Sequence, residues 1–258
     1  MDRSAHFDIV IMHRLDQALV ERGLCDSREK AKRLILAGQA LINGQLAHKA
    51  SDKVKEGDQV ALKQTEKFVS RGGHKLEHAI EEFGIAVEGV VAIDMGASTG
   101  GFTDCLLQRG AKQVYAVDVG RGQLAWKLRQ DARVVVMERT NARELTPAGF
   151  PEAFEPVDLI VIDCSFISLK KLLPAAIALL RPFGRIVPLI KPQFEAGKAE
   201  ADRGSGVIRD PRIHERVTSE LKQFVDVQPE LAWRGLTESP LLGPAGNKEF
   251  LAHIEKIR

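Results

Sequence analysis

Several kinds of sequence feature are scarce or missing in this chain of 258 residues. Aromatic residues make up only 5% of it, so surfaces on which successive unpaired bases stack are not expected to dominate. No apolar run approaches the roughly 18 residues that a membrane-spanning helix needs. The first residues also lack the apolar core of a signal peptide, reading MDRSAHFDIVIMHR. We therefore expect a cytoplasmic protein with no part in a membrane.

Cysteines are few, and their spacing excludes two further classes of protein. There are three, Cys25, Cys105 and Cys164, with no C-x-x-C pair among them. An odd number at such spacing predicts free thiols in a reducing compartment and argues against a disulfide framework or a zinc site. No metal site is predicted.

The charge is nearly balanced overall but unevenly spread. The net charge is +2, yet residues 1–75 carry 14 Lys and Arg against 10 Asp and Glu, while the remainder is slightly acidic. A basic N-terminal part is a weak indication of nucleic-acid binding. The length suits about two domains.

Residues 14–62 carry the pattern of a small unit of two helices and a hairpin. A short amphipathic segment, RLDQALVERG, is followed by SREKAKRLILAG, which predicts a second helix capped by Asp26 or Ser27. LING then predicts a hairpin with an N-G turn. As an ordered set these motifs resemble the S4-type RNA-binding domain of small-subunit ribosomal proteins. We assign residues 1–62 to this domain and the polar residues 63–72 to a linker.

The resemblance implies that basic residues of this unit contact structured RNA through its backbone. Fixed cations on one helix face can neutralise phosphates without reading bases. For any single basic residue, a merely solvated helix face is the alternative. The predicted RNA-binding residues are Arg14, Arg28, Lys32 and Arg33, together with Arg71 of the following segment.

A glycine-rich stretch at residues 90–107, VVAIDMGASTGGFTDCLL, predicts a buried strand, a loop and the start of a helix. Neither the dinucleotide fingerprint G-x-G-x-x-G nor a phosphate loop is present. The acid at the strand end, Asp94, suits a ligand with a cationic amino-acid part, such as S-adenosylmethionine. A plain α/β turn that binds no nucleotide is the alternative.

Further strands predicted at 113–117, 134–138, 158–163 and 185–190 alternate with helical segments. This order predicts a doubly wound, mainly parallel α/β sheet with its site at the carboxyl ends of the strands. An acid at the end of the second strand commonly accepts hydrogen bonds from ribose hydroxyls. Five polar residues fall at such strand ends, namely Asp94, Asp118, Asn141, Asp163 and Lys191.

These residue types are suited to methyl transfer onto a hydroxyl group. The methyl of S-adenosylmethionine is already activated by its sulfonium, so an aligned nucleophile is the main requirement. A ribose hydroxyl needs help in losing its proton, and a Lys whose pKa is depressed by desolvation and a nearby cation can take it. An Asp between two Lys would orient them.

Seven motifs in order behind the N-terminal unit make a close resemblance to the TlyA family, which joins an S4-type domain to an FtsJ-like ribose methyltransferase. They are FVSRGGHKL, DMGASTGGFTD, AVDVGRGQLAW, ERTNAR, DCSFISL, LIKPQFE and GPAGNKEFL. The resemblance implies a Rossmann-like methyltransferase domain over residues 73–258. It also implies a catalytic tetrad of Lys75, Asp163, Lys191 and Glu249, with Glu238 as a competitor for the last place.

The same resemblance implies S-adenosylmethionine as cofactor and cytidine 2′-hydroxyls of ribosomal RNA, in one or both ribosomal subunits, as substrate. The predicted cofactor-binding residues are Asp94, Gly96, Ala97, Ser98, Thr99, Gly100, Gly101, Phe102, Asp118, Val119, Asn141 and Asp163.

Three other functions compete with this interpretation. A membrane-active haemolysin follows from a label that some family members carry, but no long apolar or strongly amphipathic basic segment supports it. A non-catalytic RNA-binding factor of the ribosome would be favoured by a degenerate tetrad, yet all four residue types are present. A base methyltransferase would need a motif of the N-P-P-Y kind. Residues 195–210 are expected to form a mobile loop that orders on RNA.

Overall fold

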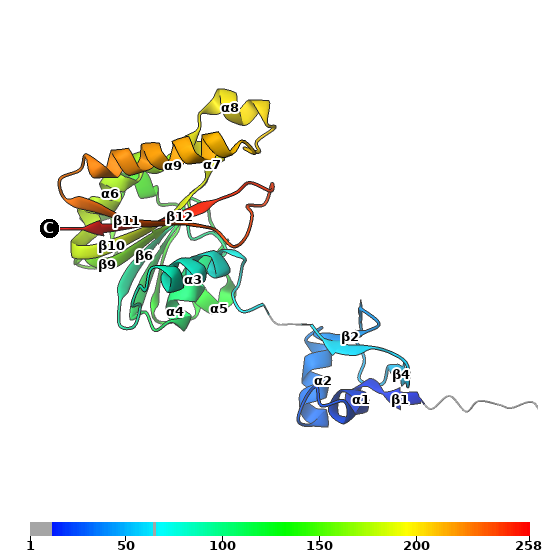
Figure 1. The fold of residues 1–258 in the computed structure, drawn as a ribbon. Helices are drawn as coiled ribbons and strands as arrows, with labels where there is room; N and C mark the ends of the chain where they lie inside the picture. The colour runs from blue at the N-terminus through cyan, green and yellow to red at the C-terminus, as the bar shows by residue number, and fades with distance from the viewer. Residues whose placement is uncertain (1–11, 64–65) are drawn as a thin grey trace, which may run out of the picture. The chain divides into compact units, whose positions relative to one another are not determined.

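The computed structural model describes residues 12–63 and 66–258, and the chain divides into two compact units, 1–66 and 67–258. Both units are drawn in Figure 1. The predicted N-terminal domain begins at residue 1, so its first eleven residues lie outside the described part. No helix in the described ranges is long and apolar enough to cross a membrane.

The first unit packs two helices against short strands, because each helix has one apolar face. The side chains of Leu15, Leu19, Ala31 and Ile35 meet in its core. Ser27 caps the second helix by accepting the N–H of Lys30 at 3.3 Å, which confirms one of the two predicted caps. The elements are β1 (Met12–Arg14), α1 (Leu15–Glu21), α2 (Arg28–Leu36), β2 (Ala40–Ile42), β3 (Gln45–Leu46), β4 (Lys53–Lys55) and β5 (Val60–Leu62).

The predicted hairpin of this unit is confirmed. Asn43 and Gly44 both have positive φ, 52° and 79°, as a tight two-residue turn between twisted strands requires. β2 lies between β3 and β5, and β1 pairs separately with β4. The sequence did not predict β1, since three residues carry too little periodicity and its partner lies far along the chain.

The second unit is built on a seven-stranded sheet in the order β11-β12-β10-β9-β6-β7-β8. Neighbouring strands from β10 to β8 run parallel, while β12 is antiparallel to both β10 and β11. The predicted doubly wound, mainly parallel sheet is therefore confirmed. Its strands are β6 (Val91–Met95), β7 (Gln113–Val117), β8 (Val134–Met137), β9 (Val157–Ile162), β10 (Leu180–Ile190), β11 (Leu231–Glu238) and β12 (Phe250–Lys256).

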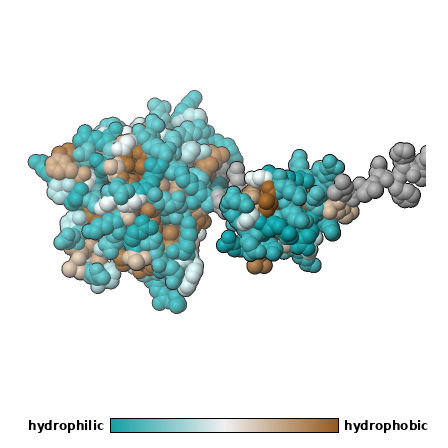
Figure 2. Space-filling view, turned by 90° about the horizontal axis from the view of Figure 1, so that it is seen from below, coloured by the Kyte–Doolittle hydropathy of each residue, from teal (hydrophilic) through white to brown (hydrophobic). Residues whose placement is uncertain are grey.

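Helices cover both faces of this sheet, α3 and α4 on one side and α6 and α9 on the other (Figure 1). Successive strand residues point to opposite faces, so Ala92 packs in one core and Ile93 in the other. Hydrophilic residues make up most of the surface visible in Figure 2. The helices are α3 (Gly72–Glu82), α4 (Gly101–Gln108), α5 (Trp126–Arg129), α6 (Leu173–Leu179), α7 (Pro192–Glu195), α8 (Lys198–Arg203) and α9 (Pro211–Asp226), with 3₁₀ turns η1 (Ala142–Glu144), η2 (Pro147–Gly149) and η3 (Leu169–Lys171).

The loop expected at 195–210 is wrong in part, because α7 and α8 occupy much of it. The polar composition of this segment gave no sign that a residue from a distant part of the chain fixes it by hydrogen bonds. Asn247, only 1% exposed, accepts the N–H of Ile208 at 2.8 Å and donates to the carbonyl of Gly206 at 2.9 Å. The final segment, which propensity left open between helix and strand, is the strand β12.

The linker expected at 63–72 is too long, since residues from 67 onward belong to the second unit. Phe68 is 2% exposed and lies in the core beside Leu76. Asp104 of α4 accepts the N–H of Val69 at 2.8 Å. The polar residues around Phe68 gave no helical or strand periodicity, so the sequence could not show that this stretch is buried.

We expect Phe68→Ala to destabilise the second unit by about 3 kcal/mol, because it empties a buried aromatic site. Differential scanning calorimetry of the full chain should show the transition of that unit at a lower temperature. Lys63→Ala is the control, since residue 63 lies in the first unit. If the unfolding temperature of the second unit is unchanged in Phe68→Ala, the segment around Phe68 belongs to the linker after all.

Candidate active site

The glycine-rich loop between β6 and α4 is shaped by two positions that only glycine fits. Gly96 has φ 87°, and a Cβ there would lie 2.9 Å from backbone atoms of Asp163. Gly100 has φ 99°, and a Cβ there would lie 2.3 Å from the side chain of Leu128. Glycine alone adopts such angles without strain. The loop therefore presses against the end of β9, and its N–H groups at Gly96 and Ala97 are held by the carbonyl of Val117.

Asp94, near the end of β6, is fully buried. Its Oδ2 accepts two hydrogen bonds from Thr103, from the backbone N–H at 2.9 Å and from the hydroxyl at 2.7 Å. Its Oδ1 has no hydrogen-bond partner in the described residues. Burial raises the pKa of Asp94 to about 7, against the two Thr103 hydrogen bonds, and the charges of Asp163 and Asp118 raise it further. A buried acceptor without a donor calls for a cationic or N–H-bearing ligand group.

Asp118 follows β7 and holds the opposite wall of the loop. Its Oδ2 accepts the N–H of Ser98 at 2.8 Å, and its Oδ1 accepts the N–H of Gly120 at 2.7 Å. A pocket of about 430 Å³ opens beside it, lined also by Asn141 and Val119. Each carboxylate oxygen can accept more than one hydrogen bond, so Asp118 is able to bind ligand hydroxyls while it fixes the loop.

Two lysine–carboxylate pairs lie in a second pocket, of about 620 Å³. Lys191 Nζ contacts Oδ1 of Asp163 at 2.6 Å and donates to the hydroxyl of Ser165 at 3.0 Å. Lys75 Nζ forms an ion pair with Glu249 Oε2. Lys75, Lys191 and Glu249 are all at least nine-tenths buried. Buried charges are tolerated when they are paired and hydrogen-bonded, so each lysine is held in place by its own carboxylate.

The structure brings nearly all the predicted site residues of the second unit to these two adjoining pockets, which share Gly96, Ser98 and Asp163. Gly100 lies behind the loop against Leu124 and Leu128. The alternative acid, Glu238, is half-exposed and pairs with Lys248. The larger pocket is lined by Arg71, Lys75, Asp94, Gly96, Ala97, Ser98, Thr99, Gly101, Phe102, Asp163, Lys191 and Glu249, and the smaller one adds Asp118, Val119 and Asn141.

Sequence reasoning missed several polar residues of the larger pocket, among them Ser165 and Gln193. Ser165 holds Lys191, as described above, and the buried Oε1 of Gln193 has no partner in the described residues. Each lies three residues beyond the last residue of a strand, in the motifs DCSF and KPQF, and that position was the signal that could have found them.

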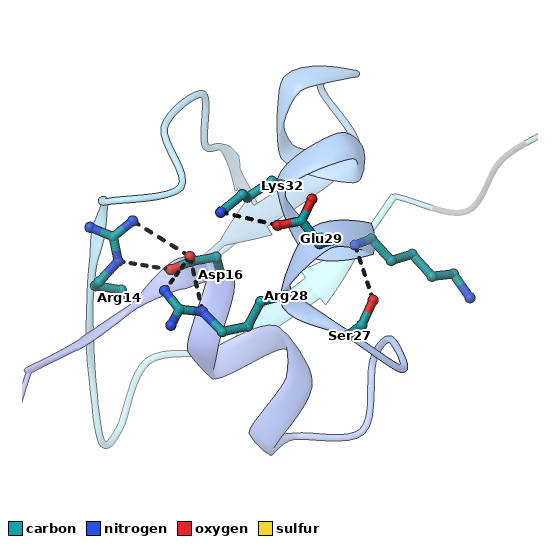
Figure 3. A network of polar contacts seen from close by, with 7 residues as sticks. Arg14, Asp16, Ser27, Arg28, Glu29 and Lys32 are labelled. Atoms are coloured by element: carbon teal, nitrogen blue, oxygen red, sulfur yellow. Dashed lines mark hydrogen bonds and ion pairs between the residues drawn. The ribbon is translucent and has the colours of Figure 1, made fainter.

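The predicted RNA-binding residues of the first unit are not simply solvated. Arg14 and Arg28 both bind the buried carboxylate of Asp16 (Figure 3). Lys32 lies 3.4 Å from Glu29 on the same helix, and Arg33 is exposed. Arg71 belongs to the second unit, where it lines the larger pocket.

Each of the two units matches a known protein family. The FtsJ-like methyltransferase family model matches residues 68–256. The chain belongs to this family. An S4 domain model matches residues 13–60, so the first unit carries the predicted S4 domain.

Relatives of the whole chain are methyltransferases or carry a hemolysin name. The 16S/23S rRNA (cytidine-2′-O)-methyltransferase TlyA of Mycobacterium tuberculosis is 48% identical over 92% of this chain and 87% of its own length. Hemolysin A of Brachyspira hyodysenteriae is 44% identical over 93% of this chain and 99% of its own length. A solved structure of a hemolysin-named protein from Streptococcus thermophilus is 46% identical, covers 95% of this chain and 88% of that one, and has a TM-score of 0.71.

We expect Asp94→Asn to gain stability relative to the wild type as the pH rises. A carboxyl group whose pKa is raised by folding favours the folded state while it is protonated, and that stability is lost as the pH passes from about 4 to about 7. Asn does not titrate. In thermal unfolding without ligand, the variant should therefore gain on the order of 2 kcal/mol between pH 5 and pH 8. Parallel pH profiles for the two proteins would contradict this account of the site.

Proposed function

We propose that this chain transfers a methyl group from S-adenosylmethionine to the 2′-hydroxyl of a cytidine in ribosomal RNA. The observation that carries the proposal is the meeting of two lysine–carboxylate pairs, one fully and one partly buried, beside a glycine-rich, carboxylate-lined loop in an FtsJ-like fold. The printed activity of the Mycobacterium tuberculosis relative supports the nucleotide and the RNA.

The residues of the two pockets fit S-adenosylmethionine. The unpartnered Oδ1 of Asp94 suits its ammonium group, and the close approach of the backbone at Gly96 leaves room for its amino-acid part. Asp118 suits the ribose hydroxyls, as acids at this position commonly do. When bound, the cofactor supplies a methyl group on a positively charged sulfur, which needs no further activation.

The remaining work is to deprotonate and aim the attacking hydroxyl. Lys191 is the group placed to accept the proton of the 2′-hydroxyl, and Asp163 and Ser165 hold its Nζ in one orientation. Lys75, fixed by Glu249, donates a hydrogen bond that positions the same hydroxyl. Holding nucleophile and methyl donor in line accounts for much of the acceleration expected of such a site.

The S4 domain supplies the affinity for folded RNA in this proposal. Arg14, Arg28, Lys32 and Arg33 lie on or beside α2 and neutralise backbone phosphates, and Arg71 meets the RNA at the pocket. The target ribose must leave its helix to enter the pocket. An enzyme with this substrate acts in the cytoplasm, where ribosomal subunits are found.

Asp94→Asn should weaken S-adenosylhomocysteine binding at pH 8 by about tenfold or more, because the ammonium group loses a charged partner. Isothermal titration calorimetry measures this, with Asp26→Asn, an exposed change of the same kind in the other unit, as control. Equal affinities for all three proteins would remove Asp94 from the cofactor site.

Lys191→Ala and Glu249→Gln should each lower methyl transfer to unmodified ribosomal subunits by about 100-fold or more, since the general base or its partner framework is lost. Label from S-adenosylmethionine recovered as 2′-O-methylated nucleotide gives the rate and names the subunit. Glu238→Gln is the matched control, because its carboxylate pairs only with the half-exposed Lys248 among the described residues.

Loss in Glu238→Gln with full activity in Glu249→Gln would reverse the choice of acid. A wild-type chain that binds S-adenosylhomocysteine and ribosomal subunits but transfers no methyl would instead support the second candidate, a non-catalytic RNA-binding factor of the ribosome.

A further inference from the structure

Asp16 is a buried acid in the middle of a surface expected to bind an anion. It lies in the first turn of α1 with its side chain fully buried, and its carboxylate holds two arginines from different elements (Figure 3). Arg14 contacts Oδ1 through Nε at 3.0 Å and Oδ2 through Nη2 at 3.5 Å. Arg28 contacts Oδ2 through Nη2 at 2.8 Å and through Nε at 3.3 Å.

The two arginines remain available although they are paired. Their side chains are 41% and 50% exposed, whereas that of Asp16 is inaccessible. A guanidinium group carries five N–H donors in a fixed plane, and each arginine spends only its Nε and one Nη2 donor on Asp16. The remaining donors of both groups have no partner in the described part of the chain, so they can bind a second anion. With two cations and one anion, the cluster also keeps a net positive charge.

The other cations of α2 are held in a different way. Lys30 pairs with Asp26 at 2.8 Å and Lys32 with Glu29 at 3.4 Å, and both acids are more than four-fifths exposed. Exposed pairs between flexible side chains fix little geometry and contribute little energy. Burial of Asp16 and its two-sided contacts are therefore the features that set Arg14 and Arg28 apart.

We propose that Asp16 is a positioning residue. It fixes the guanidinium groups of Arg14 and Arg28 so that together they bind one phosphodiester group of folded RNA. Both guanidinium groups bond to the same oxygen of Asp16, so they lie close enough for one phosphate to contact both. Planar, preorganised donors lose less entropy on binding than free side chains do. The inference deepens the proposed function, on whose RNA substrate it rests.

The sign of the effect of Asp16→Asn on RNA affinity separates this role from simple electrostatics. The substitution makes the surface more positive by one charge, which alone would tighten binding to any RNA. Loss of positioning instead weakens binding to the specific site by about tenfold, the order of one charge-assisted contact. Affinities of the full chain are measured for unmodified ribosomal subunits and for a short RNA duplex of unrelated sequence.

The expected result is weaker binding to a ribosomal subunit with unchanged or tighter binding to the unrelated duplex. In methyl transfer, KM for the subunit should rise while kcat stays the same. Asp26→Asn is the matched control, since it makes the same charge change on the same unit but frees only Lys30. Tighter binding to both RNAs in Asp16→Asn, as in Asp26→Asn, would overturn the proposal.

A double-mutant cycle covers the case in which Asp16→Asn disturbs the fold of the first unit. In an Arg14→Ala, Arg28→Ala background, Asp16→Asn should cause little further loss of subunit affinity, because the residue acts through those arginines. A further loss as large as in the wild type would reveal a structural defect and also overturn the proposal. Because these readouts are affinities, they stand even if no methyl transfer is found.

Discussion

The parallel alignment of β6, β7, β9 and β10 is the constraint on which the site depends. After β6 the chain builds outward through β7 and β8, and then returns to the other side of β6 with β9 and β10. The crevice at such a reversal, beyond the carboxyl ends of the strands, is open because the loops on its two sides run in opposite directions. Asp94, Asp118 and Asp163 reach it from three neighbouring strands, and reversing any one of these strands would carry its acid to the opposite edge of the sheet.

Gathering acids at one edge has an electrostatic cost, which the structure meets in different ways. Asp163 faces Lys191, and Asp118 accepts backbone N–H groups of the loop it shapes. Among the described residues Asp94 has neither a cation nor a full set of donors, and burial raises its pKa to about 7. Of these three acids, Asp94 has the fewest protein partners, so a cationic ligand group would stabilise it most. Loss of folding stability at a site that binds a ligand is a usual trade.

Much of this fold could be predicted because local patterns agree with the global structure. The alternation of apolar runs with helical segments identified the parallel sheet, and polar residues at strand ends identified Asp94, Asp118, Asp163 and Lys191. The pairing of Lys75 with Glu249 could not be derived from periodicity, since the two are 174 positions apart and meet only when β12 enters the sheet beside β10. Resemblance to a family, rather than spacing, pointed to it.

The features that sequence reasoning missed share a physical cause. In each of them a polar residue, which its type alone would place at the surface, is buried. Asn247 anchors 206–208, Asp104 binds the backbone at Val69, and Asp16 sits beneath two arginines. Each is a short polar side chain with at least one partner from a distant part of the chain, so no local window contains the whole arrangement.

Asp16 and Asp163 use the same physical device in the two units. In each case a carboxylate that is buried or partly buried holds a longer cationic side chain, so the cation reaches its target with part of its conformational freedom already removed. A long side chain loses roughly 2 kcal/mol of rotamer entropy when it is immobilised. Fixing it during folding moves that loss from the binding step to the folding step, where the burial of a whole core can offset it. An acid within a basic surface can therefore help that surface to bind an anion, although the acid itself carries the opposite charge.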